Sequence, residues 1–285
     1  MKKNRWLILV AGIVIQTILG GIYAWSIFVP ELIDTYGLSK GQSGTIFGLC
    51  IAIFTLAMIP GGRLLSARGP RLPAFIGAVL FGAGYVVASA SNGNYPILLL
   101  GISVLSGCGI GFGYVCPLTV GMRWFPKHKG LITGVAVAGF GGGAAMVSQV
   151  GGFLTTTLGY TPFQTFFIFG TLFLCMVVLA GSVMQFPETA EKIVPLSALK
   201  PSQVMGHANF HLLYLAMFMG LAAGFAVNAN LKEIFSGNGH AAEIGITAVS
   251  LFALANAAGR VIWGAVFDRI RSSAAIQANL ACQAA

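Results

Sequence analysis

The sequence predicts an all-α protein that crosses a membrane many times. Hydrophobic residues make up 56% of the 285 residues, charged residues make up only 8%, and the mean hydropathy is +0.86. A soluble domain contains about 25% charged residues, so this composition excludes a protein whose surface faces water on all sides. Apolar runs of about 20 residues, the length that crosses a hydrocarbon core of ~30 Å, recur through nearly the whole chain. Together these observations predict a polytopic helical membrane protein.

The apolar runs define eight predicted spans, with charged side chains in the connections between them. Every Lys, Arg, Asp and Glu except Arg260 falls in a connection or at the end of a run. The basic and then apolar start of the chain resembles a signal peptide, but its apolar run is too long and another span follows. The predicted spans are 6–30, 43–61, 72–91, 95–119, 130–155, 162–186, 209–231 and 244–267.

Lys and Arg are distributed unevenly between alternate connections. With the N-terminus in the cytoplasm, nearly all of them fall on the cytoplasmic side, and only Lys40 and Lys232 fall outside. Cytoplasmic loops of membrane proteins carry such an excess of positive charge. We therefore expect a multi-pass protein of the inner (plasma) membrane with a cytoplasmic N-terminus. The net charge of +9 then follows from topology, with the lipid bilayer as surroundings and no nucleic-acid partner.

The longest cytoplasmic connection, residues 187–207, comes after six predicted spans. It divides the chain into a six-helix half, residues 1–186, and the start of a second half, residues 208–285, as in transporters built from internal repeats. A loop that occurs twice supports this division, because both copies follow the second span of a half. The first copy contains Gly62, Gly69 and Arg71, and the second contains Gly264, Asp268 and Arg269.

These two loops resemble the G-x-L-x-D-R-x-G-R-R loop of the major facilitator superfamily. The run RWFPKHKGL at 123–131 and the segments 4–6, 23–26 and 259–264 are similar to the oxalate/formate antiporter family within it. The resemblance implies a bundle of two helical halves that works by alternating access, with the loop Asp, here Asp268, helping to close a cytoplasmic gate. Because too few residues follow the eighth span for a full second half, we expect a truncated chain.

Arg260 is the one charged residue within a predicted span, and a charge at bilayer depth marks a functional site by default. Asn256 and Trp263 share its helical face by i, i+3 and i+4 spacing. No predicted span contains Asp or Glu, so the expected partner is an anion that is not part of the protein. A guanidinium binds a carboxylate through two parallel hydrogen bonds, which favours a small carboxylate. Snorkelling of Arg260 toward the cytoplasmic interface is the alternative.

Span one places Gln16, Gly20 and Tyr23 on one face, where an amide and a phenol can hydrogen-bond a carboxylate. The resemblance to the oxalate/formate antiporter family implies that Arg260 pairs with the substrate carboxylate. It also implies an aromatic box that contains Tyr23 and Trp25, and a cavity that Tyr114 of span four faces. An interfacial aromatic belt is the alternative for Tyr23 and Trp25.

The sequence carries no motif for catalysis and no paired carboxylates within a span, so we expect no enzyme, no cofactor and no metal. We expect instead a secondary transporter of small carboxylates of the oxalate, formate, lactate or pyruvate class. Antiport or uniport is favoured, because no span carries an acid for a proton relay. The alternatives are a cation or drug exporter, which usually carries a buried acid, and a membrane sensor or channel subunit. The sequence indicates no obligatory protein partner.

Overall fold

The computed structural model describes residues 4–187, 201–221 and 242–284, and every regular element in these ranges is helical. The all-α fold class expected from the sequence is confirmed. Six helical segments among the described residues are long and apolar enough to cross a membrane. They are Arg5–Ile27, Lys40–Arg68, Arg71–Ser89, Tyr95–Trp124, Lys129–Thr157 and Pro162–Ser182.

These six segments correspond to the first six predicted spans, with small shifts at their ends. The seventh predicted span, 209–231, lies only partly within the described residues, where it begins as the helix Ala208–Leu221. The eighth is α11, Ala242–Phe267, and α12, Ser272–Ala284, follows it.

Three of the six segments depart locally from α-helical geometry, a feature that is frequent at hinges and functional sites. The other spans are α3, Lys40–Arg68, α4, Arg71–Ser89, and α8, Pro162–Ser182. The first of the three departing spans is α1, Arg5–Gly20, which continues as a 3-10 helix, Gly21–Ile27. The fourth span consists of α5, Tyr95–Leu98, a π-helix, Leu99–Ser106, and α6, Gly107–Trp124. The fifth span is α7, Lys129–Gly152, which continues as a π-helix, Phe153–Thr157. The short α2, Val29–Asp34, follows the first span.

Local sequence signals set several helix ends. The Ser39 hydroxyl accepts a hydrogen bond from the Gln42 amide, and the Gln42 side chain accepts one from the Ser39 amide, so this reciprocal pair begins α3. Thr161 and Gln164 make the same pair at the start of α8. Gly69, at φ +80°, turns the chain between α3 and α4, in a conformation that glycine adopts without steric cost.

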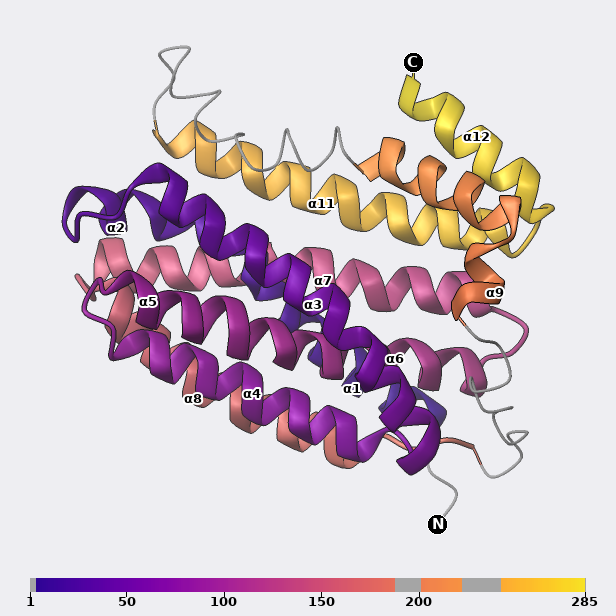
Figure 1. The fold of residues 1–285 in the computed structure, drawn as a ribbon, viewed down its shortest axis with the longest axis horizontal. Coiled ribbons are helices and arrows are strands. Elements are labelled where there is room, and N and C mark those ends of the chain that lie inside the picture. Colours follow the sequence, from indigo (N-terminus) through magenta and orange to yellow (C-terminus); the bar gives the residue numbers. More distant parts are fainter. Residues whose placement is uncertain (1–3, 188–200, 222–241, 285) are drawn as a thin grey trace.

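The six spans run alternately in opposite directions and form one bundle (Figure 1). Within it α4 packs on α8 and α6, α3 packs on α6, and α1 packs on α7. Helices α1, α4 and α7 begin, and α3, α6 and α8 end, at one end of this bundle. We call it the basic end, because it carries Arg5, Arg68, Arg71, Arg123 and Lys129.

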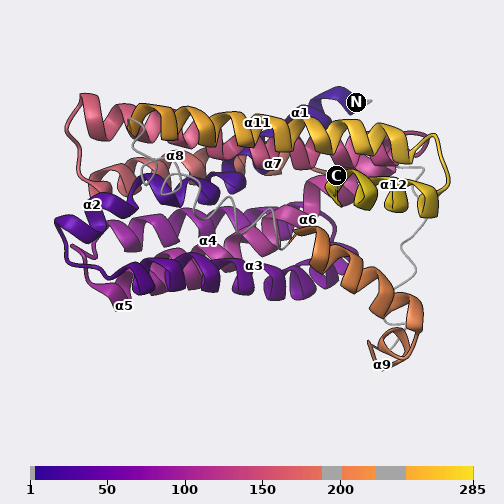
Figure 2. The same ribbon diagram turned by 90° about the horizontal axis from the view of Figure 1, so that it is seen from above.

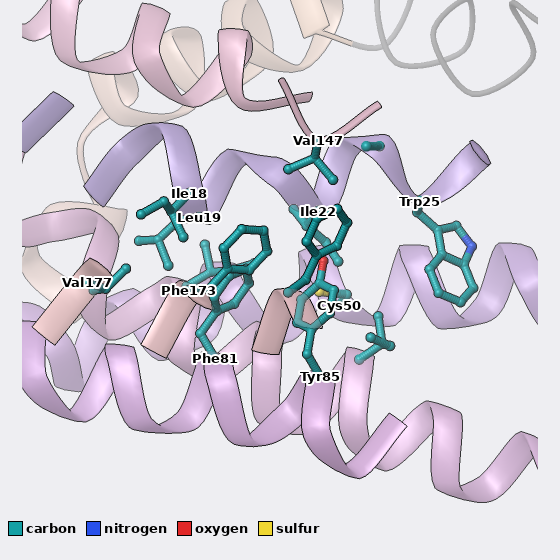
Figure 3. Packing of buried hydrophobic residues seen from close by; sticks show 14 of the residues in the cluster. Ile18, Leu19, Ile22, Trp25, Cys50, Phe81, Tyr85, Val147, Phe173 and Val177 are labelled. Atoms are coloured by element: carbon teal, nitrogen blue, oxygen red, sulfur yellow. The ribbon is translucent and has the colours of Figure 1, made fainter. Parts of the chain in front are cut away.

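The bundle has a core of interleaved aliphatic and aromatic side chains (Figure 3). Phe81 of α4 and Phe173 of α8 stack with ring centroids 5.7 Å apart. Ile18 and Leu19 of α1 are fully buried in the same cluster. Side-chain packing of this kind holds transmembrane helices together, because lipid tails are as apolar as the helix surfaces themselves.

Glycines let α4 and α6 approach each other closely. A Cβ atom on Gly77 would lie 2.7 Å from the Gly113 nitrogen, which is closer than real Cβ contacts allow. Small residues at helix interfaces in membranes have this role. The many glycines of the fourth span therefore serve helix packing.

Helix α11 lies lengthwise along α7, on the outside of the six-span bundle (Figures 1 and 2). A Cβ atom on Gly134 of α7 would collide with the Arg260 carbonyl, and one on Gly264 of α11 would collide with the Gly130 carbonyl. The two helices therefore touch through their backbones near the basic end. This contact brings Arg260 against the six-span bundle.

Candidate functional site

Arg260 projects from α11 toward the six-span bundle. Its Nε donates a hydrogen bond to Asn256 Oδ1 at 2.7 Å, one turn earlier on α11, and a terminal nitrogen donates to the Val137 carbonyl of α7 at 3.5 Å. Tyr23 and Tyr114 lie near enough to the guanidinium for its positive charge to act on their hydroxyl groups. Arg260 thus faces α7 and two tyrosines of the bundle.

No carboxylate lies within salt-bridge distance of Arg260 among the residues that the structure describes. Its side chain is half-buried. A guanidinium has five N–H donors, and the hydrogen bonds to Asn256 and Val137 use two of them. The remaining donors suit an anion, because burying a positive charge without a negative partner is costly.

The two tyrosines belong to a cluster of rings opposite Arg260. Tyr23 and Tyr114 both meet Phe140 of α7 edge to face, with centroids 5.3 and 5.1 Å apart and interplanar angles of 89° and 83°. Phe54 of α3 lies 5.2 Å from Tyr114, and Phe47 of α3 lies 6.1 Å from Tyr23. We call these five residues the aromatic cluster. Edge-to-face pairs of this kind stabilise the ring arrangement by about 0.5–1.5 kcal/mol each.

The cluster has two layers. Phe54 and Phe140 are buried, whereas Tyr23, Tyr114 and Phe47 are half-buried. Tyr23, Tyr114 and Phe47 are therefore the more accessible layer of the cluster, and the two phenylalanines lie deeper in the bundle. This layer offers two phenol groups and aromatic ring area next to one positive charge.

Close backbone contact between α1 and α7 places Tyr23 in the cluster. A Cβ atom on Gly20 would collide with the Phe140 carbonyl, and one on Gly143 would collide with the Thr17 carbonyl. The chain then continues as a 3-10 helix, which carries Tyr23. Two glycines, one from each helix, thus allow the approach that brings the ring of Tyr23 to Phe140.

Trp25 lies elsewhere, which corrects its expected place in an aromatic box. Its indole nitrogen donates a hydrogen bond to Ser43 Oγ at 3.0 Å, and its ring stacks on Phe166 of α8. Only 6% of Trp25 is exposed. Tyr23 and Trp25 lie two positions apart in the 3-10 helix, so their side chains lie on different faces of it. Trp25 packs α1 against α3 and α8 and is not in the aromatic cluster.

Gln16, expected to hydrogen-bond a substrate carboxylate, lies inside the bundle instead. It is fully buried, and its Nε2 donates a hydrogen bond to the Tyr114 carbonyl of α6 at 3.3 Å. Its Oε1 has no hydrogen-bond partner among the described residues. Gln16 therefore lies behind Tyr114 and contacts its backbone.

Asn256 and Trp263, which share a face of α11 with Arg260, separate in the structure. Asn256 accepts the hydrogen bond from the guanidinium, and it lies beside Gly141 of α7, where a Cβ atom would be 3.5 Å from Asn256 Oδ1. Trp263 instead lines an apolar cavity of about 350 Å³ between the helix Ala208–Leu221, α11 and α12, together with Met217 and Phe267. Asn256 thus adjoins the candidate site and Trp263 lies in a different cavity.

The second copy of the repeated loop makes a specific contact at the basic end. The carboxylate of Asp268 accepts hydrogen bonds from the backbone amides of Gly130 and Leu131, at 2.7 and 2.8 Å. These amides lie in the first turn of α7, where helical N–H groups lack partners within the helix and attract negative charge. Gly264 allows the contact by its approach to Gly130, whereas Arg269 is exposed.

The first copy of the loop acts within the six-span bundle. Gly69 forms the turn between α3 and α4, and Arg71 Nε donates to the Met184 carbonyl after α8 at 3.3 Å. Trp124 makes a similar bond to the Gln185 carbonyl at 2.8 Å. Gly62 has open space around it. The described residues contain no group of His, Cys, Asp or Glu side chains that could hold a metal ion.

The sequence singles out Arg260, Asn256, Tyr23 and Tyr114; in the structure Asn256 contacts Arg260, and Tyr23 and Tyr114 share Phe140. Sequence reasoning missed Phe47, Phe54 and Phe140. Phe47 and Phe54 are seven residues apart on one face of α3, and Phe140 is the one large side chain within a run of glycines. These signals are weak alone, because phenylalanine is common in membrane helices.

Comparisons with known proteins agree with this fold. The family model described as Major Facilitator Superfamily matches residues 6–285. An uncharacterized MFS-type transporter, YhjX, of Escherichia coli is 26% identical over 94% of this chain and 67% of its own length. The oxalate:formate antiporter of Oxalobacter formigenes is 28% identical over 94% of this chain and 64% of its own length. The chain thus spans about two thirds of the length of these relatives.

A solved structure shows the same fold at low sequence identity. The crystal structure of a D-xylose-proton symporter superposes with a TM-score of 0.58 at 17% identity, and the match covers 94% of this chain and 70% of that one.

Proposed function

The chain belongs to the major facilitator superfamily of membrane transporters, and we propose that it serves the transport of small carboxylate anions by alternating access. The candidate substrates are of the oxalate, formate, lactate and pyruvate class. The substrate would bind between α11 and the six-span bundle, at Arg260, Asn256, Tyr23 and Tyr114. The oxalate:formate antiporter among the similar proteins supports this substrate class.

The observation that carries the proposal is a half-buried Arg260 with no described carboxylate partner, near Tyr23 and Tyr114. A carboxylate placed between Arg260 and the tyrosines would receive parallel hydrogen bonds from the guanidinium and further hydrogen bonds from the phenol groups. No described carboxylate competes for the guanidinium. A snorkelling arginine would instead extend toward the basic end, away from these rings. A cation exporter is disfavoured, because no predicted span carries the acid that a cationic substrate needs.

The proposed topology follows the positive-inside pattern. The basic end would face the cytoplasm of the inner membrane, with the N-terminus there. Residues 1–186 would form one half, 187–207 the connection and 208–285 the start of the second half. The contact of Asp268 with the first turn of α7 would then close the cytoplasmic side between the halves.

A comparison of a carboxylate with its uncharged amide tests the substrate class. Ligand-induced shifts of the melting temperature of the purified chain are measured with lactate and with lactamide, which has nearly the same shape. We expect stabilisation that saturates with lactate, oxalate, formate or pyruvate and none with lactamide. Equal stabilisation by lactate and lactamide would show that the site does not recognise negative charge.

A further inference from the structure

We propose that Gln16 is a positioning residue, which ties α1 to α6 at Tyr114 and thereby sets the separation of Tyr23 and Tyr114. It would act through the tyrosines and not by touching the substrate. The spacing of the tyrosines is a property of the fold, and only the effect on ligand affinity rests on the proposed function.

The hydrogen bond from Gln16 reaches α6 next to a carbonyl that lacks its helical hydrogen bond. Pro117 lies inside α6 and has no N–H group, so the Gly113 carbonyl, four residues earlier, loses its helical donor. Tyr114 is the next residue, and its carbonyl accepts the hydrogen bond from Gln16. Gly12, one turn before Gln16, lies against Pro117, since a Cβ atom on Gly12 would be 3.2 Å from Pro117 Cβ. One face of α1 thus packs along the turn of α6 that contains Tyr114 and Pro117.

The burial of Gln16 favours a role in position over one in substrate contact. The side chain is fully buried, and Oε1 has no partner among the described residues. An unpaired buried acceptor is unfavourable, and an apolar side chain of the same length would avoid that cost. The Nε2 donor, which crosses from α1 to α6, is the group that an apolar residue could not replace.

The hydrogen bond between Gln16 and the Tyr114 carbonyl bears on the positions of both tyrosine rings. Tyr23 is seven residues after Gln16, in the 3-10 helix that continues α1. Tyr23 and Tyr114 each meet Phe140 edge to face, from opposite helices. A hydrogen bond between α1 and the Tyr114 backbone therefore holds both rings against Phe140.

The test replaces Gln16 in the purified chain labelled with 3-fluorotyrosine and records its fluorine NMR spectrum. Gln16→Met keeps the length of the side chain but removes the donor and the unpaired acceptor. Gln16→Asn keeps the amide and shortens its reach by one methylene. The variants Tyr114→Phe and Tyr23→Phe assign the two resonances. Tyr85, buried among Phe81 and Phe173 of the core, provides an internal reference.

We expect the Tyr114 resonance to shift or broaden in both Gln16 variants, while the Tyr85 resonance stays in place. The matched control is Thr165→Val on α8, which replaces a fully buried hydroxyl that has no hydrogen-bond partner among the described residues. It should leave the Tyr114 resonance unchanged. An unchanged Tyr114 resonance in either folded Gln16 variant would overturn the proposal.

A second readout separates this proposal from the proposed function. The affinity for oxalate or lactate, measured by titration calorimetry, should fall roughly fivefold in Gln16→Met, as for the loss of one ordinary hydrogen bond, and stay unchanged in Thr165→Val. If the wild-type chain binds neither anion and the Tyr114 resonance still moves, the carboxylate function fails and the positioning role stands. If Gln16→Met binds the anions as tightly as the wild type, the positioning role fails and the carboxylate function stands.

Discussion

The carboxylate of Asp268 accepts the backbone amide hydrogen of Gly130 at 2.7 Å, across 138 residues of sequence. The bond joins the end of α11 to the first turn of α7, where the helix dipole favours a negative charge. It occurs beside the glycines through which the two helices touch. The repeated loop after span eight thus has a definite contact in this structure, and the same two helices meet again where Arg260 donates to the Val137 carbonyl.

Substitution of the glycines should separate α7 from α11. Gly134→Ala places a methyl group against the Arg260 carbonyl, which is backbone and cannot move aside alone. We expect the melting temperature in detergent to fall by several degrees, because an overpacked contact typically costs about 1–3 kcal/mol.

Gly142→Ala is the matched control, because it lies on the same helix with no atom within 4 Å of the added methyl group. It should be neutral or slightly stabilising, since alanine favours a helix over glycine by about 1 kcal/mol. Equal effects of Gly134→Ala and Gly142→Ala would contradict the backbone contact.

Tyr23 and Trp25 should respond differently to loss of their polar groups. Trp25→Phe removes the hydrogen bond to Ser43 inside the bundle, so it should lower stability by about 1 kcal/mol and leave carboxylate affinity unchanged. Tyr23→Phe removes a phenol near Arg260, so it should weaken carboxylate binding. Melting temperatures and binding titrations of both variants check this, and weaker binding in Trp25→Phe alone would contradict the assignment.

Orientation in the membrane can be tested with single cysteine variants and a membrane-impermeant maleimide on whole cells. Lys40→Cys, at the start of α3, should be labelled from outside. Arg68→Cys and Lys127→Cys, at the basic end, should be labelled only after the membrane is opened. Labelling of the second pair in intact cells would reverse the proposed topology.

The sequence was sufficient to predict the first six spans, because each needs a long apolar run. It also singled out Arg260 as a candidate, since one charge in an apolar helix is conspicuous. It did not predict the burial of Trp25 between α3 and α8, because that depends on which helices pack together. The partners of Asp268 and of Gln16 depend on which helices pack together, and neither residue type nor spacing specifies contacts so far apart in the chain.

The contacts of Phe140 likewise could not be predicted from the sequence. Its sequence neighbours are glycines, which predict close packing but not a partner. Only the approach of α1 at Gly20 and of α6 at Tyr114 turns this ring into the support of the aromatic cluster.

The affinity of Arg260 variants for a carboxylate tests whether Arg260 binds the substrate. Arg260→Gln removes the charge, and Arg260→Lys keeps the charge but loses the planar pair of donors. Both should fold, because neither adds a charge to α11. Arg269→Gln, an exposed arginine beyond the end of the same helix, is the control.

We expect the dissociation constant for the bound carboxylate to rise roughly tenfold to a hundredfold in Arg260→Gln, as for the loss of a charge-assisted hydrogen bond. Arg260→Lys should be intermediate, and Arg269→Gln should match the wild type. Unchanged affinity in folded Arg260→Gln would contradict the account and favour a snorkelling arginine with no role in binding.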